Sequence, residues 1–269
     1  MLRQIDDWPV DVAAVGVTDG DATIDVHGAT TQRLRLASVT KLLTAVGVLV
    51  AIQDGLVHLD EPAGPDASTV RHLLAHASGL PYAEGAPNTT VGKRRIYSNV
   101  GYERLGELVA DRTDVPFAEH LRIEVFEPLG MDDTSLDGSP AADAAGTVDD
   151  LLRFAREILR PSLLDTDLVD DATSPQFPAL DGVLPGFGRQ TPNLWGLGFE
   201  IRGGKSPHWT GNGQPEHTCG HFGQAGSFLW IDRQAGIACA FLGDRDFDTW
   251  AADRWPSFNQ DVFDHATGR

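Results

Sequence analysis

Residues 37–53 read ASVTKLLTAVGVLVAIQ, and they place a serine and a lysine at the start of an apolar run. From Leu42 to Gln53 the run is uncharged, and Gly55 follows it closely. It is long enough for a helix and too short to span a bilayer. A helix that is apolar nearly all round is covered by protein on most sides. The stretch therefore predicts a central buried helix, with Ser38 and Lys41 in its first turn.

Ser38 and Lys41 are three positions apart, so a helix brings their hydroxyl and amine to one face. A serine hydroxyl is a poor nucleophile until a base takes its proton, and burial lowers the pKa of a lysine toward that role. Arginine stays protonated and cannot act as the base that takes this proton. Lysine is scarce here, because the 21 lysines and arginines include only three lysines: Lys41, Lys93 and Lys205. A serine that merely caps the helix is the alternative interpretation.

The rest of the chain predicts an α/β protein of the α+β type. Alternating residues at 12–17 and 22–26 flank an Asp-Gly turn and predict a hairpin, and further strands are expected at 195–201, 227–231 and 236–242. Helical patterns cover 70–77, with Ser68 as its cap, 100–111, 117–126, 148–159 and 249–263. We expect one antiparallel sheet completed by both chain ends, flanked by helices and carrying an inserted, mostly helical lobe.

This order of elements is interpreted as a single catalytic domain over residues 1–269. The sheet lobe is assigned to residues 1–60 and 200–269, and the helical lobe to residues 61–199. The substrate is expected to depend on loops at 83–93, 183–194 and 203–218.

The composition narrows the possible partners. The hydrophobic fraction of 41% and the charged fraction of 22% are those of an ordinary globular protein. A net charge of −18 would repel phosphate backbones and anionic lipids, so neither nucleic acid nor a membrane is expected as a partner. No signal-peptide core is visible near residue 1, which favours a cytoplasmic protein. Cys219 and Cys239 are interpreted as thiols, with a disulfide between them left open.

A second group of polar residues lies in IYSNVGYERLG, just before the predicted helix at 100–111. Tyr97 is one of only three tyrosines, and its functional interpretation is a proton shuttle shared with Lys41. Asn99 would orient the substrate or the lysine. The alternative is a helix cap beside a packed tyrosine.

A third group lies in CGHFGQAGSFLWID, where His221 and Gly223 lead toward a strand. Glycine at such a position lets a substrate lie beside the backbone as an added strand. An amide at this edge, together with the amide of Ser38, is suited to form an oxyanion hole. An ordinary half-buried histidine is the alternative interpretation of His221.

Together, in this order, the three groups resemble the serine β-lactamase and penicillin-binding protein superfamily. The resemblance is to its class C β-lactamase-like branch, which includes esterases and D-aminopeptidases, and it extends to VRHLLAHASGLP, FEPLGMDDTS and WGLGFEI. It implies an acyl-enzyme mechanism that needs neither a metal nor a cofactor. The implied catalytic residues are Ser38, Lys41 and Tyr97. The implied substrate-binding residues are Asn99, His221, Gly223 and Gln224, and the implied oxyanion hole consists of the backbone amides of Ser38 and Gln224.

One departure from that family bears on the substrate. The β-lactamases carry Lys-Thr-Gly where this chain has His221, Phe222 and Gly223, so a hydroxyl that helps to hold a carboxylate is missing. We therefore expect a hydrolase of small esters or amides. The alternatives are weak β-lactamase or D-aminopeptidase activity, a penicillin-binding protein, and a non-catalytic sensor that keeps the fold.

Two other hydrolase classes fit less well. A zinc site built on His72 and His76 would need a glutamate next to the first histidine, where Leu73 stands. An α/β-hydrolase would need a G-x-S-x-G pentapeptide, which does not occur in the chain.

Overall fold

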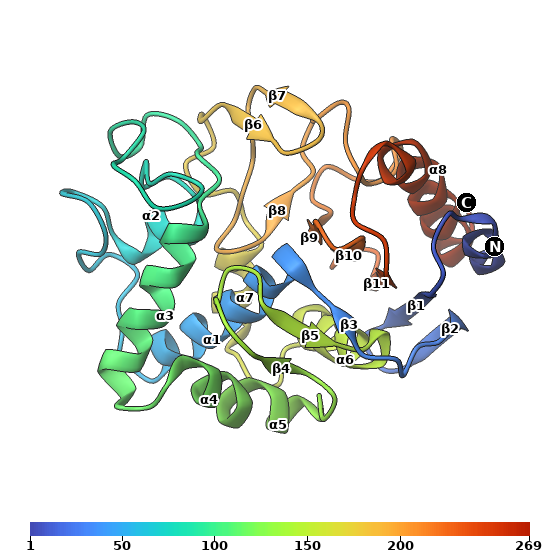
Figure 1. Ribbon diagram of the computed structural model, residues 1–269, viewed down its shortest axis with the longest axis horizontal. Coiled ribbons are helices and arrows are strands. Elements are labelled where there is room, and N and C mark those ends of the chain that lie inside the picture. The colour runs from blue at the N-terminus through green and yellow to red at the C-terminus, as the bar shows by residue number, and fades with distance from the viewer.

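Both ends of the chain contribute strands to one antiparallel sheet, in a computed structural model that describes residues 1–269 (Figure 1). The strand order is β2-β1-β11-β10-β9-β8, and every neighbouring pair is antiparallel. These strands are β1 (Ala13–Asp19), β2 (Thr23–Gly28), β8 (Glu200–Ile201), β9 (Cys219–Gly223), β10 (Ser227–Asp232) and β11 (Ile237–Gly243). The predicted fold class, with a helical lobe beside the sheet, is confirmed.

Helices cover the two faces of the sheet. The long helix α8 (Thr249–Thr267) and the short 3-10 helix η1 (Leu2–Asp7) lie against one face, where the two chain ends meet (Figure 1). Helix α6 (Val148–Leu159) packs on the other face against β1, β10 and β11, although its residues fall within the range assigned to the helical lobe. Cys219 and Cys239 are free thiols in the cores on opposite faces, so they do not form a disulfide.

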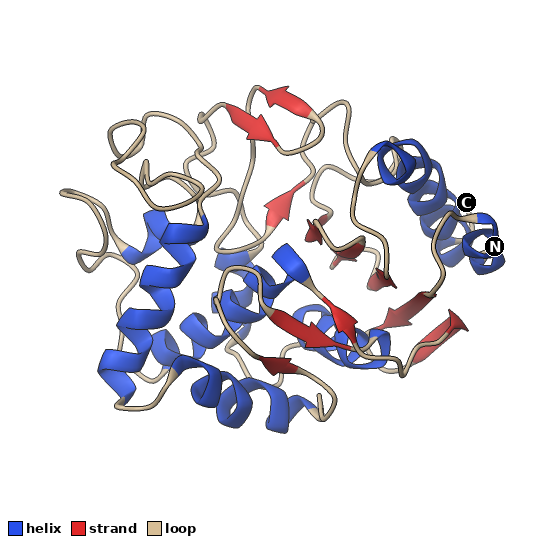
Figure 2. Cartoon of the chain, in the orientation of Figure 1, coloured by secondary structure: helices blue, strands red, loops and turns tan.

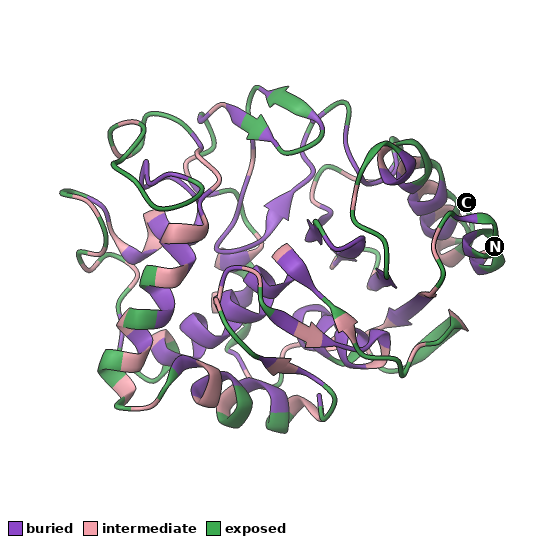
Figure 3. Cartoon of the chain, viewed as in Figure 1, coloured by how far each residue is buried: buried purple, intermediate pink, exposed green.

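The apolar run forms α1 (Thr40–Gln53), which is buried from Thr40 to Ala51. Figure 3 shows this burial, together with the exposed edge strand β2. The expected central helix is thus present. The placement of Ser38 in its first α-helical turn is wrong, because Ala37–Val39 form a separate 3-10 turn, η2, directly before it.

The helical lobe differs from the sequence expectation in detail (Figure 2). Its helical elements are α2 (Val70–Leu74), α3 (Asn99–Thr113), α4 (Phe117–Leu121), the π-helix η3 (Arg122–Phe126), α5 (Glu127–Leu129) and α7 (Thr166–Ala172). Helix α2 is shorter than predicted, since His76 adopts a left-handed φ of 55°. Its cap position is Thr69, not Ser68, whose hydroxyl has no hydrogen-bond partner.

Short strands complete the structure. A small sheet joins β3 (Leu34–Arg35), β5 (Ala144–Gly146) and β4 (Ser135–Leu136), and a hairpin joins β6 (Gly182–Leu184) to β7 (Gly188–Gln190). The strand predicted at 195–201 is reduced to the two residues of β8. None of the helices combines the length and apolar character needed to cross a bilayer.

Candidate active site

The turn that carries Ser38 is held against the sheet at two points. The Ser227 hydroxyl of β10 donates a 2.7 Å hydrogen bond to the Leu36 carbonyl. Gly223 of β9 approaches the same carbonyl so closely that an added Cβ would lie 2.4 Å from it, so a larger residue would push the strand away. Ala37 has a left-handed φ of 44°, a strained conformation directly before Ser38, which lies in the middle of the turn.

Lys41 lies fully buried behind this turn. Its Nζ donates to Asn99 Oδ1 at 2.7 Å and to the Ala141 carbonyl at 2.8 Å, and it lies 4.6 Å from the centre of the Tyr97 ring. Burial lowers the pKa of Lys41 to about 7, and the charge of Glu103 acts in the opposite direction. A substantial fraction of this lysine is therefore neutral near pH 7 and able to take a proton.

The segment that carries Tyr97 and Asn99 contains both a helix cap and side chains that contact Lys41. Ser98 caps α3 by accepting from the Gly101 amide at 3.0 Å, and its hydroxyl donates to the Pro81 carbonyl at 2.7 Å. His76 supports the same segment, because its Nδ1 accepts from the Ser98 amide at 3.1 Å. Ser98 is thus the cap, which leaves its two neighbours free to contact Lys41.

His221 is a neutral partner of Tyr97. Its Nδ1 lies 2.6 Å from the Phe222 carbonyl, which can only accept, so this nitrogen carries the proton. Burial, helped by the charge of Lys41, lowers the pKa of His221 to about 3. The unprotonated Nε2 therefore accepts from the Tyr97 hydroxyl at 3.3 Å. Burial also raises the pKa of Tyr97 above its usual value, so this phenol is not the resting base.

Part of β9 lacks a partner strand on the side of the site. The strand β8 pairs only with Cys219 and Gly220, so the backbone from His221 onward has no partner there. Gln224 follows at the end of β9, and its side-chain amide donates to the Phe247 carbonyl at 2.9 Å. The arrangement leaves an edge suited to an extended substrate.

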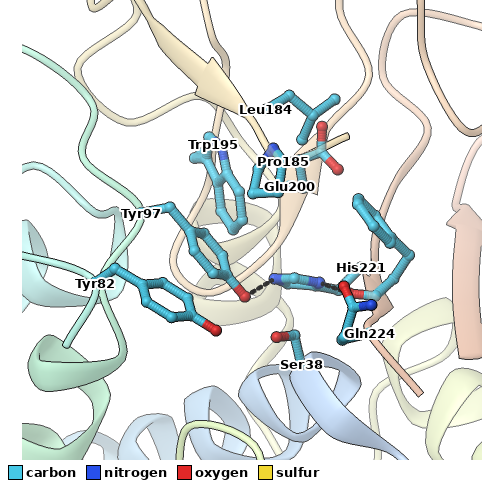
Figure 4. Close-up of a pocket in the computed structure, with 10 residues that line it drawn as sticks. Ser38, Tyr82, Tyr97, Leu184, Pro185, Trp195, Glu200, His221 and Gln224 are labelled. Carbon is cyan, nitrogen blue, oxygen red and sulfur yellow. Dashed lines mark hydrogen bonds between the residues drawn. The ribbon is translucent and has the colours of Figure 1, made fainter. Parts of the chain in front are cut away.

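A cavity of about 260 Å³ joins these residues. In Figure 4, Ser38 lies beneath the hydrogen-bonded pair of Tyr97 and His221, with Gln224 beside it. The lining residues are Ser38, Tyr82, Tyr97, Leu184, Pro185, Trp195, Glu200, His221, Phe222 and Gln224. Of the other predicted site residues, Lys41 and Asn99 lie behind the lining and Gly223 packs against the nucleophile turn.

A buried ionic cluster that was not predicted from the sequence lies at one wall of the cavity. The Glu200 carboxylate accepts from Lys205 at 2.7 Å, and His208 and Trp209 also bind it. Although burial opposes ionisation, Lys205 and His208 hold the pKa of Glu200 well below its usual value. The scarcity of lysine that marked Lys41 applied equally to Lys205, and it was the available signal for this cluster.

Arg95 is a second residue that the sequence analysis missed, since it lies in a basic run of only three residues, KRR. It is 2% exposed and forms no ion pair in the structure, and burial lowers the pKa of its guanidinium to about 9. The guanidinium donates to four main-chain carbonyls, those of Ala75, Gln176, Phe177 and Asn193. Arg95 thus joins three loops to the segment that carries Tyr97.

We expect Glu103→Gln to shift the acid limb of the pH profile of kcat/KM to lower pH. The Glu103 charge raises the pKa of Lys41, so its removal lowers that pKa and keeps the amine neutral in more acidic solution. The matched control is Glu107→Gln, one turn further along α3, where the carboxylate is exposed and pairs with Arg104. A profile of kcat/KM against pH checks this, and an unchanged limb in Glu103→Gln would contradict the electrostatic link.

Comparisons with known proteins agree with this geometry. A family model described as Beta-lactamase matches residues 6–261. A solved β-lactamase structure from Mycobacterium bovis is similar over 99% of this chain and 100% of that chain, with 47% identity and a TM-score of 0.97. The fold therefore defines a protein of the β-lactamase/transpeptidase-like class. The chain belongs to the Beta-lactamase family and is an enzyme of the serine hydrolase type, which confirms the resemblance inferred from the motifs.

Similarity to curated relatives is more limited. The D-alanyl-D-alanine-carboxypeptidase/endopeptidase AmpH of Escherichia coli is 26% identical over 144 residues, which are 40% of this chain and 37% of that protein. The ML-236A carboxylate methylbutanoyltransferase of Penicillium citrinum is 31% identical over 152 residues, 37% of this chain and 36% of that protein. The chain thus matches about a third of the length of its curated relatives.

Proposed function

We propose that this protein hydrolyses small uncharged esters or amides through an acyl-enzyme on Ser38. The observation that carries the proposal is the buried Lys41, whose pKa is lowered to about 7 and whose amine lies under Tyr97, beside the serine turn. This is the group whose protonation equilibrium lies nearest neutral pH within the site. A general base with such a pKa is matched to reaction near neutrality.

In the first step, Ser38 Oγ forms a bond to the substrate carbonyl carbon, and the carbonyl electron pair moves onto oxygen. The backbone amides of Ser38 and Gln224 stabilise the resulting oxyanion. Lys41 takes the serine proton, directly or through Tyr97, whose own proton points toward His221. The bond to the leaving group then breaks, and the proton passes to the departing oxygen or nitrogen.

In the second step, water attacks the acyl-enzyme carbonyl and gives its proton to the same base. The bond to Ser38 Oγ breaks, the serine recovers a proton, and the acid is released. Asn99 keeps Lys41 in position through its 2.7 Å hydrogen bond, and His221 fixes the orientation of the Tyr97 hydroxyl. These roles use only side chains and backbone groups of this chain.

The cavity favours a small, uncharged substrate. Its lining contains neither lysine nor arginine, and its ionised side chain is the carboxylate of Glu200. A penicillin carboxylate would find no cationic donor there, and Phe222 offers it no hydroxyl. The volume of about 260 Å³ lies below the roughly 300–1,000 Å³ typical of pockets for drug-sized ligands.

The test is the intact mass of the protein, followed over time after addition of p-nitrophenyl acetate or, separately, penicillin G. We expect the ester to give an acetyl adduct that forms and clears in the unmodified protein and is absent in Ser38→Ala. We expect penicillin to leave no adduct. The control is Ser257→Ala, which removes an exposed hydroxyl from α8 and should behave as the unmodified protein.

Other results would point to the alternatives. A lasting penicillin adduct would favour a penicillin-binding or sensor protein, and turnover of penicillin would favour a β-lactamase. Folded protein that neither reagent labels at Ser38 would contradict the proposed mechanism.

A further inference from the structure

Tyr82 combines exposure with a place in the catalytic cavity. Its side chain is 58% exposed, and of the six large hydrophobic residues that are exposed it alone lines this cavity. Its backbone is fixed, because the Tyr82 carbonyl accepts from the Asn99 amide at 3.1 Å. A large aromatic side chain is thus held at the mouth of the site with much of its surface uncovered by protein.

The uncovered ring continues an aromatic wall. Tyr82 lies nearly parallel to Tyr97, with 23° between the ring planes and 6.1 Å between their centres, and Trp195 follows at 5.9 Å from Tyr97. Leu184 and Pro185 line another part of the cavity, on the far side of the Tyr97 ring from Tyr82 (Figure 4). A flat apolar group that enters beside Tyr82 would therefore meet aromatic faces.

The position of Tyr97 indicates which part of the substrate reaches Tyr82. Under the proposed function, on which this inference rests, the leaving atom receives its proton from the Lys41–Tyr97 pair. The leaving group must then lie within hydrogen-bond reach of the Tyr97 hydroxyl. The Tyr82 ring stacks beside Tyr97 at the mouth of the cavity, so it flanks the path by which that group departs.

We propose that Tyr82 forms a subsite for an aromatic leaving group, so that the preferred substrates are esters or amides of aryl or arylmethyl alcohols and amines. Aromatic pairs contribute about 0.5–1.5 kcal/mol beyond the area that they bury, which corresponds to roughly a 2- to 12-fold effect on a rate ratio. Tyr82 is thus a specificity-determining residue rather than a source of the basal rate.

The test compares benzyl acetate with ethyl acetate by acid release in a pH-stat. Both esters form the same acetyl-enzyme, so the ratio of their kcat/KM values reports only on acylation and the leaving group. We expect Tyr82→Ala to lower the benzyl-to-ethyl ratio about 3- to 10-fold. Tyr82→Phe keeps the ring and should keep the ratio. The control Ile24→Ala shortens a side chain that is 51% exposed on β2, outside the cavity lining, and should change neither rate.

A second pair of esters tests whether Tyr82 contacts the leaving group or the acyl group of the substrate. The ratio for ethyl phenylacetate against ethyl acetate should be the same in Tyr82→Ala and the unmodified protein, since these esters share a leaving group. A fall in the phenylacetate-to-acetate ratio, with the benzyl-to-ethyl ratio unchanged, would overturn the leaving-group assignment. An unchanged benzyl-to-ethyl ratio in Tyr82→Ala would overturn the subsite while leaving the proposed function intact. If the unmodified protein hydrolyses none of these esters, the proposed function itself is contradicted, and the subsite with it.

Discussion

Replacing Lys41 by methionine is expected to lower kcat/KM for a small ester by about 10²- to 10⁴-fold, the usual contribution of a general acid–base group. Methionine has a similar length and no titratable amine, so the serine proton loses its acceptor. We expect the variant to remain folded, because removal of a buried amine offsets part of the cost of its two lost hydrogen bonds, those to Asn99 and to the Ala141 carbonyl. Kinetics and thermal unfolding by circular dichroism measure the two effects separately.

The pH profile provides the readout specific to Lys41. For the unmodified protein, kcat/KM should rise with pH through about 7 and level off above it, because only the neutral amine accepts a proton. The residual activity of Lys41→Met should lack this limb. The control Lys93→Met changes an exposed lysine and should leave both the rate and the profile intact. A limb near pH 7 that persists in Lys41→Met would assign the titration to another group.

Replacing Arg95 by leucine is expected to destabilise the protein by about 3 kcal/mol, since each buried carbonyl left without a donor costs roughly 1–3 kcal/mol. Three carbonyls, those of Ala75, Gln176 and Asn193, lose their donor in this variant, whereas the Phe177 carbonyl keeps the Leu180 amide at 3.2 Å. Relief of the buried positive charge offsets part of the loss. At roughly 2–4 °C per kcal/mol for a chain near this size, Tm should fall by about 6–12 °C.

The neighbouring arginine offers a matched control. Arg94 is half exposed and forms a single 3.7 Å ion pair with Asp181, so Arg94→Leu should change Tm little. Arg95 lies two residues before Tyr97, so Arg95→Leu should also lower kcat at temperatures where the variant remains folded. Equal Tm values for the two variants would contradict the role of Arg95 as a link between loops.

Local sequence patterns predicted the helices and strands whose conformation is determined by their own residues. The hairpin near the start and the helix at 148–159 have clear periodicity, the apolar helix is a long uninterrupted apolar run, and all three are present. The strands of two or three residues, such as β3 and β5, are too short to show any period. At 195–201 the sequence predicted a full strand, but Gly198 adopts a left-handed φ of 93°, and only the last two residues belong to a strand.

Within the candidate site, the motifs predicted those residues that stand out in the sequence through a scarce residue type or a characteristic spacing. Ser38, Tyr97, His221 and Gln224 all reach the cavity that the resemblance implied. Arg95 was missed because its partners are main-chain carbonyls up to 98 positions away, which no sequence pattern marks. The aromatic surface of Tyr82 was also missed, because its exposure depends on loops packing around it rather than on its neighbours in sequence.

The pairing of β1 with β11 has a consequence for biosynthesis. At the end of this pair, Asp11 donates its amide to Asp244, 233 positions away. At about 5–20 residues per second, the ribosome needs roughly 10–50 s to supply that partner. During this interval the apolar strand β1 lacks the neighbour beside which it is buried, and such non-local pairing folds slowly. The nascent chain is thus most open to aggregation before its last strand emerges, and slower production at low temperature with abundant chaperones should raise the yield of folded protein.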